Sequence, residues 1–252
     1  MKKLLTVLFA VMMVVSLAAC SNKKPEEPVV EPTPTEPEVT VMSHAEYAAA
    51  EIGTECTIEA YVQDHQSWWN DAIKLYLQDK DGAYFAYDVN CTKEDADKLV
   101  TGVKVRVTGV KTDYKGEIEL YQDDLGNRPT LEIIEDGDTF VAEPADVTAL
   151  VGTDELYNHV NEYVLFSNVT VKEVLYDWDG SKAHGDDCDM YCTVVTESGA
   201  ELSVTVPRYL RGLDSEVYTT VESLVEGDVV DACGFLYWYD TANPHITAVV
   251  KK

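Results

Sequence analysis

Aromatic and histidine side chains are concentrated in stretches of this chain that we interpret as loops. All four tryptophans lie in or beside these stretches. Flat rings stack well on sugars, on nucleic-acid bases and on peptide side chains. The candidate ligand-binding residues are His65, Trp68, Trp69, Tyr114, Trp178, His184, Tyr237, Trp238 and Tyr239, with His245 close to the last three. The alternative is that these rings pack inside the fold.

Acidic side chains are concentrated in the stretch 177–189. Its carboxylates offer hard oxygen ligands, and its Asp-x-Asp-Gly start is similar to that of a calcium loop. The stretch departs from the EF-hand pattern because Cys188 stands where a bidentate Glu is needed and Gly180 comes two positions early. Ca²⁺ is the one cofactor that the sequence suggests, and a solvated acidic loop is the alternative. The candidate metal ligands are Asp177, Asp179, Asp186, Asp187 and Asp189.

Nucleophilic chemistry has little support in the sequence. Five cysteines follow Cys20, and because five is odd, at least one must be a free thiol or bond to another chain. The chain contains no Gly-x-Ser-x-Gly, no His-Glu-x-x-His and no phosphate-binding loop. We therefore expect that the protein is not an enzyme.

The charge of the chain argues against a nucleic-acid partner. With 19 Lys and Arg against 46 Asp and Glu, the formal net charge is −27. The loop at 63–72 has no Lys or Arg, and the stretch 177–189 has one Lys against five acids. A field of this sign repels phosphate backbones and attracts cations and basic partners.

The first 20 residues have the features of an export signal. Lys2 and Lys3 precede an apolar run that is too short for an ordinary membrane span. The run ends in Leu17-Ala18-Ala19-Cys20, which resembles the lipobox of bacterial lipoproteins. That resemblance implies acylation of Cys20, cleavage before it, and anchoring to the extracytoplasmic face of the cell membrane through acyl chains alone. The alternative is an ordinary secretory signal with an incidental cysteine.

The stretch 21–40 is rich in proline and glutamate. It has almost nothing to bury, so it is expected to be an extended tether. We expect two domains to follow, at 41–143 and 144–252, each long enough for its own core.

The first of these domains shows the alternation of β-strands. Cys56–Val62 has apolar residues at every second position, and Ile73, Leu75 and Leu77 continue that phase after the loop at 63–72. A hairpin turn is expected at Asp79–Gly82, with a positive φ at the glycine. Phe85, Tyr87 and Val89 are then expected to form the inward face of the third strand.

The same order of elements returns in the second domain. An offset of 117 aligns Leu77 with Val194, and an offset of 125 aligns Gly102 with Gly227. Because the apolar phase and the strand glycines agree, we interpret the chain as an internal duplication.

The repeated unit resembles the OB modules of secreted bacterial proteins, some of which are attached to extracellular nucleases. The matching residues are Leu77-Gln78-Asp79, Gly82, Tyr84, Tyr87, Gly102, Val105, Val107, Gly109, Tyr114 and Gly116. The second repeat lacks the Gln-Asp pair at Val195-Thr196. The resemblance implies an all-β protein with small helices between strands, built as two tandem five-stranded OB-fold-like barrels. In such barrels, ligands contact the face of strands 2 and 3 and the loops between strands 1–2 and 4–5.

These observations predict a non-enzymatic, lipid-anchored protein that binds an extracellular carbohydrate, peptide or protein through its aromatic loops. Three alternatives stay open: a structural or interaction protein whose repeats pack together, a calcium-binding protein, and an accessory module of a nuclease.

Overall fold

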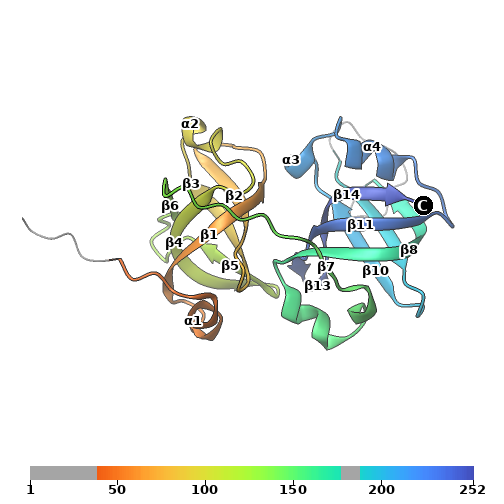
Figure 1. The fold of residues 1–252 in the computed structure, drawn as a ribbon, viewed down its shortest axis with the longest axis horizontal. Helices are drawn as coiled ribbons and strands as arrows, with labels where there is room; N and C mark the ends of the chain where they lie inside the picture. Colours follow the sequence, from red (N-terminus) through yellow and green to blue (C-terminus); the bar gives the residue numbers. More distant parts are fainter. Residues whose placement is uncertain (1–38, 177–187) are drawn as a thin grey trace, which may run out of the picture. The chain divides into compact units, whose positions relative to one another are not determined.

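The structure is a computed structural model that describes residues 39–176 and 188–252. Val39–Lys252 forms one compact unit. Within it, two closed β-barrels follow each other along the chain, each with its own apolar core (Figure 1). The predicted fold class, all-β with two tandem five-stranded OB-fold-like barrels, is confirmed.

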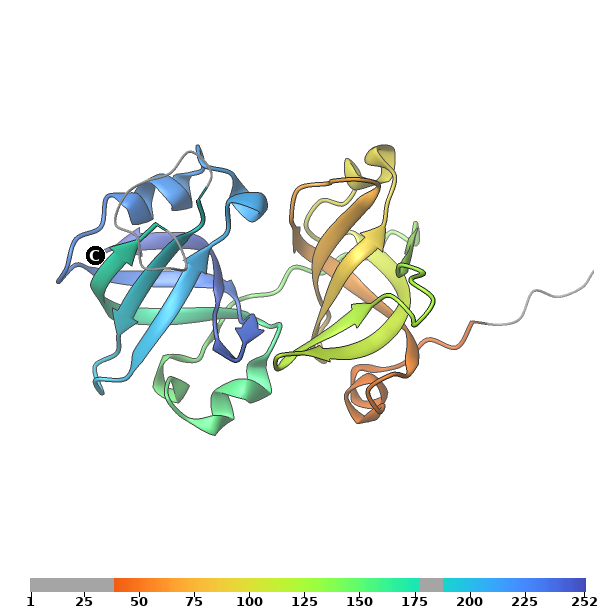
Figure 2. The same cartoon turned by 180° about the vertical axis from the view of Figure 1, so that it is seen from behind.

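The first barrel closes in the strand order of an OB-fold (Figure 2). The ring runs β1-β2-β3-β5-β4 and returns to β1, and the one parallel pairing in it joins β3 to β5. A sixth strand, β6, pairs with the edge of β4 that lies opposite β1. The strands are β1 (Glu55–His65), β2 (Ala72–Gln78), β3 (Ala83–Asn90), β4 (Lys104–Tyr114), β5 (Glu117–Tyr121) and β6 (Thr130–Ile133); the helices are α1 (His44–Ala49) and α2 (Lys93–Ala96).

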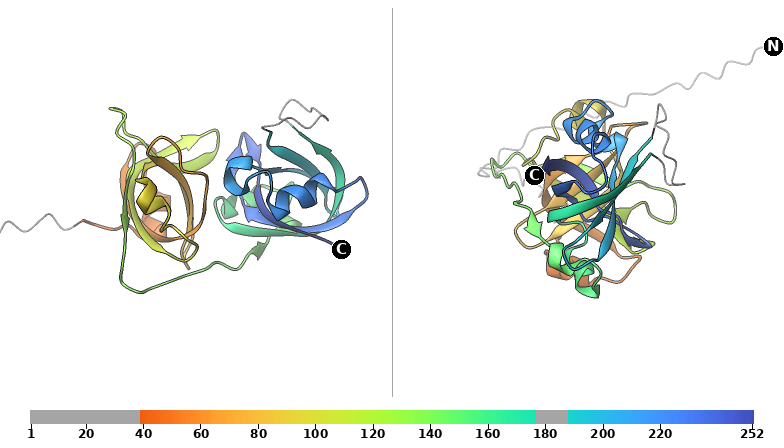
Figure 3. Two further views of the ribbon diagram at one scale, coloured as in Figure 1. Left: turned by 90° about the horizontal axis from the view of Figure 1, so that it is seen from above. Right: turned by 90° about the vertical axis from the view of Figure 1, so that its right-hand side faces the viewer.

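The second barrel repeats this order. Its ring runs β8-β9-β10-β14-β11 and returns to β8, again with one parallel pairing, between β10 and β14. The helix α4 lies against the second barrel (Figure 3). Its residues Val217, Tyr218 and Val221 belong to the core of that barrel. The strands are β7 (Ala145–Asp146), β8 (Tyr163–Leu175), β9 (Met190–Val195), β10 (Glu201–Val206), β11 (Val229–Phe235), β12 (Trp238–Tyr239), β13 (Thr241–Ala242) and β14 (His245–Lys251); the helices are η1 (Thr148–Leu150), η2 (Asp154–His159), α3 (Arg208–Arg211) and α4 (Glu216–Glu222).

The duplication is visible in the backbone at two glycines. Gly102 has a φ of 91° and Gly227 a φ of 92°, a region that favours glycine. The Gly102 amide donates to the carbonyl of Val62 at 2.7 Å, and the Gly227 amide donates to the carbonyl of Val171 at 2.9 Å. Both glycines therefore turn the chain against the first strand of their barrel.

The alternation in β1 holds, and the predicted phase of β3 is wrong. Cys56, Ile58, Ala60 and Val62 are all fully buried in the first core. In β3, however, Tyr84, Ala86 and Val89 point inward, and the predicted residues Phe85 and Tyr87 point outward. The reason is a β-bulge: Ile73 pairs with Val89 but Leu75 pairs with Ala86, so β3 has one extra residue there.

The expected positive φ at Gly82 is also wrong. Two amides of the turn, those of Asp81 and Gly82, donate to the Asp79 carboxylate, and this closes the turn without a left-handed residue. A glycine is needed here for space, because a Cβ atom on Gly82 would lie 2.3 Å from the ring of His44.

Candidate functional site

The outer face of β2 and β3 carries bulky rings that pack against the second barrel. Tyr76 and Phe85 are each 1% exposed and form an apolar cluster with Leu210 and Phe235. The rings of Tyr76 and Phe235 stack with their centroids 4.4 Å apart and their planes 20° apart. This is the face that OB barrels commonly use for ligands. In the first barrel it is covered by the second.

A buried polar chain crosses the same contact. The Gln66 amide donates to the Tyr76 hydroxyl at 3.0 Å, and that hydroxyl lies 2.6 Å from Nδ1 of His245. Burial lowers the pKa of His245 to about 3. A neutral imidazole has one donor and one acceptor nitrogen, so the uncharged ring can make this hydrogen bond. The His245 ring also stacks on Tyr237, with centroids 4.2 Å apart.

Further hydrogen bonds between the barrels surround this chain. The Tyr163 amide donates to the side-chain oxygen of Gln78 at 2.9 Å, and the Ser67 amide donates to the carbonyl of Tyr209 at 2.7 Å. Arg211 forms an ion pair with the carboxylate of Asp64. Because directional bonds lie on several sides of the aromatic cluster, the contact specifies one arrangement of the barrels.

The second barrel carries small polar residues where the first carries rings. Leu77 and Val194 are equivalent core positions, so their outward neighbours, Tyr76 and Thr193, are equivalent too. Tyr76 pairs with Phe85 across β2 and β3, whereas Thr193 pairs with Ser203 across β9 and β10. The second barrel therefore lacks rings at this pair of positions, which are equivalent to those of Tyr76 and Phe85.

Several of the predicted ligand-binding residues have structural contacts instead. Trp68 is half-buried, and its indole nitrogen donates to the carbonyl of Cys91 at 2.7 Å. Trp238 is half-buried between Gly116 and Tyr157, where its ring centroid lies 4.8 Å from that of Tyr157. Tyr237, together with the nearby His245, belongs to the contact between the barrels. These rings pack inside the fold, which is the alternative that the sequence left open for them.

His65 and Trp69 lie in and after the end of β1. His65 is half-buried, and its Nδ1 lies 2.8 Å from the carbonyl oxygen of Gln66. Trp69 is 80% exposed at a two-residue turn in which Asn70 and Asp71 both have positive φ. No described residue makes a ring contact with Trp69. It remains an isolated exposed ring.

Two predicted residues, Tyr114 and Tyr239, lie together at the surface. They are 51% and 40% exposed, and their ring centroids are 5.8 Å apart at an angle of 56°. Tyr114 ends β4 of the first barrel, and Tyr239 belongs to the β12–β13 hairpin of the second. The Nζ atom of Lys115 lies 4.1 Å from the centroid of the Tyr239 ring and 3.0 Å from the carboxylate of Asp240. We call Tyr114, Lys115 and Tyr239 the junction cluster.

The predicted calcium ligands cannot be assembled from the described residues. Asp177, Asp179, Asp186 and Asp187 lie outside them, as do Trp178 and His184. Asp189 is described, and its carboxylate accepts a hydrogen bond from the Arg208 amide at 2.8 Å. Within 39–176 and 188–252, no three His, Cys, Asp or Glu side chains form a group that could hold a metal ion.

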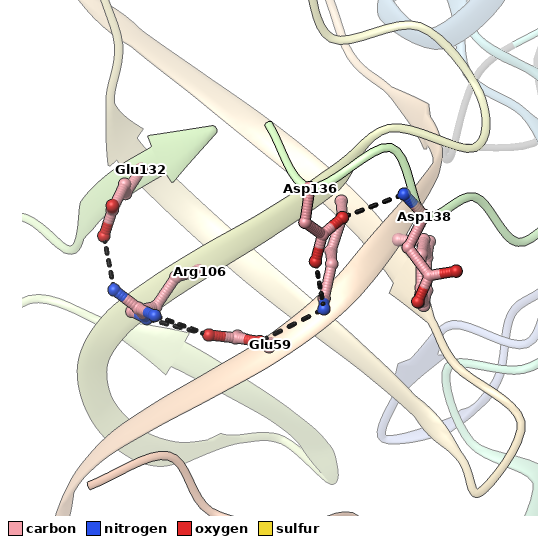
Figure 4. Close-up of polar contacts among 7 residues, drawn as sticks. Glu59, Arg106, Glu132, Asp136 and Asp138 are labelled. Carbon is pink, nitrogen blue, oxygen red and sulfur yellow. Dashed lines mark hydrogen bonds and ion pairs between the residues drawn. The ribbon is translucent and has the colours of Figure 1, made fainter. Parts of the chain in front are cut away.

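The acidic residues on the outer side of β1, β4 and β6 form an ion-pair ladder (Figure 4). Arg106 donates to Glu59 at 2.6 Å and to Glu132 at 2.6 Å, and these three residues are direct partners across neighbouring strands. Lys104 bonds to Asp136 at 2.8 Å. Since the carboxylates are held by cations, the ladder aligns β6 with the barrel and offers no open metal site.

The five cysteines after Cys20 form no disulfide. Burial raises the pKa of Cys91 to about 11 and that of Cys192 to about 12, so neither is a thiolate at neutral pH. Cys20 lies outside the described residues. In the part of the chain that the structure describes, no helix is both long and apolar enough to span a bilayer.

Sequence reasoning missed the residues that carry the contact, namely Tyr76, Phe85, Leu210 and Phe235. It also missed Glu117 and Glu119 of β5, which are buried beside the contact. One feature of the sequence could have indicated the contact. Tyr76 is a large ring in an outward position, between the inward Leu75 and Leu77. A ring on the outer face of a barrel strand indicates that something covers that face.

Comparison with known proteins gives only remote likenesses. No protein-family model matches the chain, and no curated protein matches it. Among solved structures, one described as the molecular basis for abrogation of activation of pro-inflammatory cytokines has a TM-score of 0.35 and 9% identity, covering 80% of this chain and 94% of the other. A replication protein A heterotrimer bound to single-stranded DNA has a TM-score of 0.32 and 14% identity, covering 77% of this chain and 49% of the other. The tetrameric p202 HIN2 structure has a TM-score of 0.30 and 12% identity, covering 80% and 95%. These likenesses are too remote to bear on the function.

Proposed function

We propose that this chain is a non-enzymatic binding protein, which a lipid anchor holds on the extracytoplasmic face of the cell membrane. The lipobox-like Leu17-Ala18-Ala19-Cys20 and the tether at 21–40 support the anchor. The ligand is an extracellular carbohydrate, peptide or protein. Nucleic acid is disfavoured by the net charge of −27.

The observation that carries the binding role is the junction cluster. Tyr114 and Tyr239 offer two exposed rings at an angle, and Lys115 adds donors beside them. Rings of this kind stack on sugar faces and on peptide side chains, and Asp240 supplies an acceptor next to them. Among the candidates that the structure describes, Trp68, Tyr237 and Trp238 are occupied in structural contacts and Trp69 is isolated, so this cluster is the best placed of them.

The experiment is a glycan and peptide array probed with the chain from Val39 onward, which is one compact unit. A hit should be lost in Tyr114→Ala and in Tyr239→Ala. Tyr209→Ala is the matched control, because Tyr209 is also 51% exposed but lies on α3. Binding that survives both junction variants but is lost in Trp69→Ala would place the site on the β1–β2 loop and reject the junction.

The packed rings favour a second candidate, an interaction protein whose two barrels act together on a basic partner. Rings buried between the repeats are what this alternative requires. It predicts association with a cationic protein that weakens as salt is added, because opposite charges at a surface are screened. Association that is unchanged between low and high salt would reject this candidate.

A further inference from the structure

Two glutamates of β5 are buried at the contact between the barrels. Glu117 is 0% exposed and Glu119 is 4% exposed. Their neighbour Leu120 points into the first core, so the two carboxyl groups point out of that barrel. One oxygen of Glu117 accepts a hydrogen bond from the amide of Trp238, in the second barrel, at 2.7 Å. The second barrel therefore covers Glu117, and its Tyr237 interacts electrostatically with both carboxyl groups.

Neither glutamate has a full set of partners. Oε1 of Glu117 and Oε2 of Glu119 are buried without a hydrogen bond. Among the described residues, no Lys, Arg or His nitrogen forms an ion pair with either carboxyl group. An ionised carboxylate that is buried without a cation and with a bare oxygen is strongly destabilised, whereas the uncharged acid is tolerated.

The charges around Glu117 do not stabilise its ionised form. Burial is the main cause that raises the pKa of Glu117 well above its usual range. The Trp238 amide lowers that pKa, and the negative charges of Glu119 and Asp113 raise it. The Asn161 amide also favours the charged form, although it donates its hydrogen bond to the carbonyl of Ile118 at 2.9 Å.

Glu119 is less isolated, but its uncharged form is also favoured. Burial raises its pKa to about 7, and the more distant ammonium of Lys74 on β2 lowers it. The other titratable groups that interact with the two carboxyl groups are tyrosines. They are Tyr47 of α1, Tyr76 of β2, Tyr87 of β3, Tyr121 of β5, Tyr157 of η2 and Tyr237 near β12. All six have a raised pKa and are uncharged at neutral pH, so none of them adds a charge near the glutamates.

We propose that the contact between the two barrels is linked to protons: it forms with Glu117 and Glu119 uncharged, and it weakens when these carboxyl groups ionise. In a separated state both groups would be exposed on the outer side of β5 with ordinary pKa values. At these two groups the docked state then binds more protons than the separated state, so their contribution to docking is largest at low pH and is lost as pH rises.

The size of the effect follows from the pKa of one group. A carboxyl group whose pKa is 4.5 when exposed and about 7 when docked lowers the docking constant roughly a hundredfold between pH 5 and pH 9. Glu117 lowers the docking constant further at the pH at which it ionises. His245, also at the contact, has the opposite effect: it is neutral when docked, because its pKa there is about 3, and with an ordinary pKa of 6.5 when separated it weakens docking below pH 6.5.

The test is amide hydrogen exchange of the chain from Val39 onward, corrected at each pH for the intrinsic exchange rate. The Tyr163 amide reports the contact, because it donates across it to Gln78. The Val62 amide, which donates to Val103 inside the first barrel, is the reference. We expect the protection of Tyr163 relative to Val62, divided by the same quantity in the double variant Glu117→Gln and Glu119→Gln, to fall about a hundredfold from pH 5 to pH 9. The division removes the trend from His245, which both chains share. A ratio that is equal at both pH values would overturn the proposal.

Variants test whether Glu117 and Glu119 cause this pH dependence. In the double variant Glu117→Gln and Glu119→Gln, neither side chain can ionise, so the fall of Tyr163 protection with rising pH should disappear and only the opposite trend of His245 should remain. Glu94→Gln, at a glutamate whose side chain is 85% exposed on α2, should keep the pH dependence of the unmodified chain. If the double variant does not fold, the carboxyl ¹³C signals of the unmodified chain decide: titration of Glu117 and Glu119 together with exposed glutamates would overturn the proposal. Separation of the barrels would also move Tyr114 away from Tyr239. A loss of ligand binding for that reason rests on the proposed function, whereas the exchange measurement needs no ligand.

Discussion

The hydroxyl of Tyr76 in the first barrel lies 2.6 Å from Nδ1 of His245 in the second, and both side chains are buried. A hydrogen bond between two buried groups has a narrow range of geometry and leaves costly unpaired atoms when it is broken. This pair therefore specifies how the barrels meet, and the stacked rings around it supply the apolar area.

Replacing Tyr76 by phenylalanine keeps the ring and removes the hydroxyl. Nδ1 of His245 is then buried without a hydrogen-bond partner, and we expect a loss of about 1–3 kcal/mol in the free energy of unfolding. Urea denaturation measures this loss. Tyr61→Phe is the control, because the Tyr61 hydroxyl donates to Asp138 at the surface and should be replaceable by water. Equal losses in the two variants would contradict a special role for Tyr76.

Acid should weaken the fold through His245. Its pKa is about 3 in the folded chain against an ordinary value of 6.5, so below pH 6.5 the unfolded chain binds the extra proton. The stability from this group is complete above pH 6.5 and is lost toward pH 3, by about 1.4 kcal/mol per pH unit. The variant His245→Phe should lack this slope. The measurement is the difference in unfolding free energy between the two chains at each pH, which removes the opposite trend from the glutamates. A constant difference would contradict the assignment.

A methyl group on Gly116 should disturb the contact. Gly116 has a φ of 93°, and a Cβ atom there would lie 2.5 Å from Cδ1 of Trp238. Gly126 is a matched control, because it has a φ of 82° and a Cβ atom there would have no neighbour within 4 Å. We expect Gly126→Ala to cost about 1 kcal/mol from backbone strain alone.

Gly116→Ala should cost more than Gly126→Ala in thermal denaturation, and it should also change the tryptophan emission, since Trp238 must move. Identical costs with unchanged emission would mean that Gly116 and Trp238 are not in contact.

Lys111 should act as a buried cap. Its Nζ atom donates to the carbonyls of Tyr47, Ala48 and Ala50, at 2.8–3.0 Å, where α1 ends. Lys111→Met leaves these acceptors without a partner, and we expect a loss of about 3 kcal/mol in urea denaturation. Lys98→Met, at an exposed lysine, should change little. A small effect at both positions would reject the capping role.

Much of the fold could be predicted from local pattern. The alternation from Cys56 to Val62 predicts a strand with one buried face, and all four apolar positions are buried. The recurrence of Gly102 as Gly227 predicts a duplicated barrel, and the two residues have the same positive φ, within a degree, and the same hydrogen bond. Both signals depend on contacts within one barrel, which is why short-range pattern carries them.

The phase of β3 could not be predicted in the same way. Phe85 and Tyr87 continue the alternation toward Val89, but Asp88 adopts a φ of 56° and the bulge beside it shifts the phase. Asp tolerates this conformation as well as ordinary strand geometry, and one extra residue in a strand leaves no mark in composition.

The candidate site was predicted in part, because its rings depend on contacts between distant parts of the chain. Trp68 and Trp69 are adjacent, yet one donates to a core carbonyl and the other is 80% exposed. Tyr114 and Tyr239 are 125 positions apart and meet only because Tyr76 and Phe235 stack nearby. Composition identifies aromatic loops, whereas the docking of one barrel on the other decides which rings remain free.

The most direct test of this account is a nuclear Overhauser measurement between the ring protons of Tyr76 and Phe235, whose centroids are 4.4 Å apart. Docked barrels predict strong cross-peaks between the two rings near pH 5, together with cross-peaks from Tyr237 to Phe85, whose centroids are 5.5 Å apart. Well-resolved ring signals without a cross-peak between Tyr76 and Phe235 at that pH would contradict the covered face of β2 and β3.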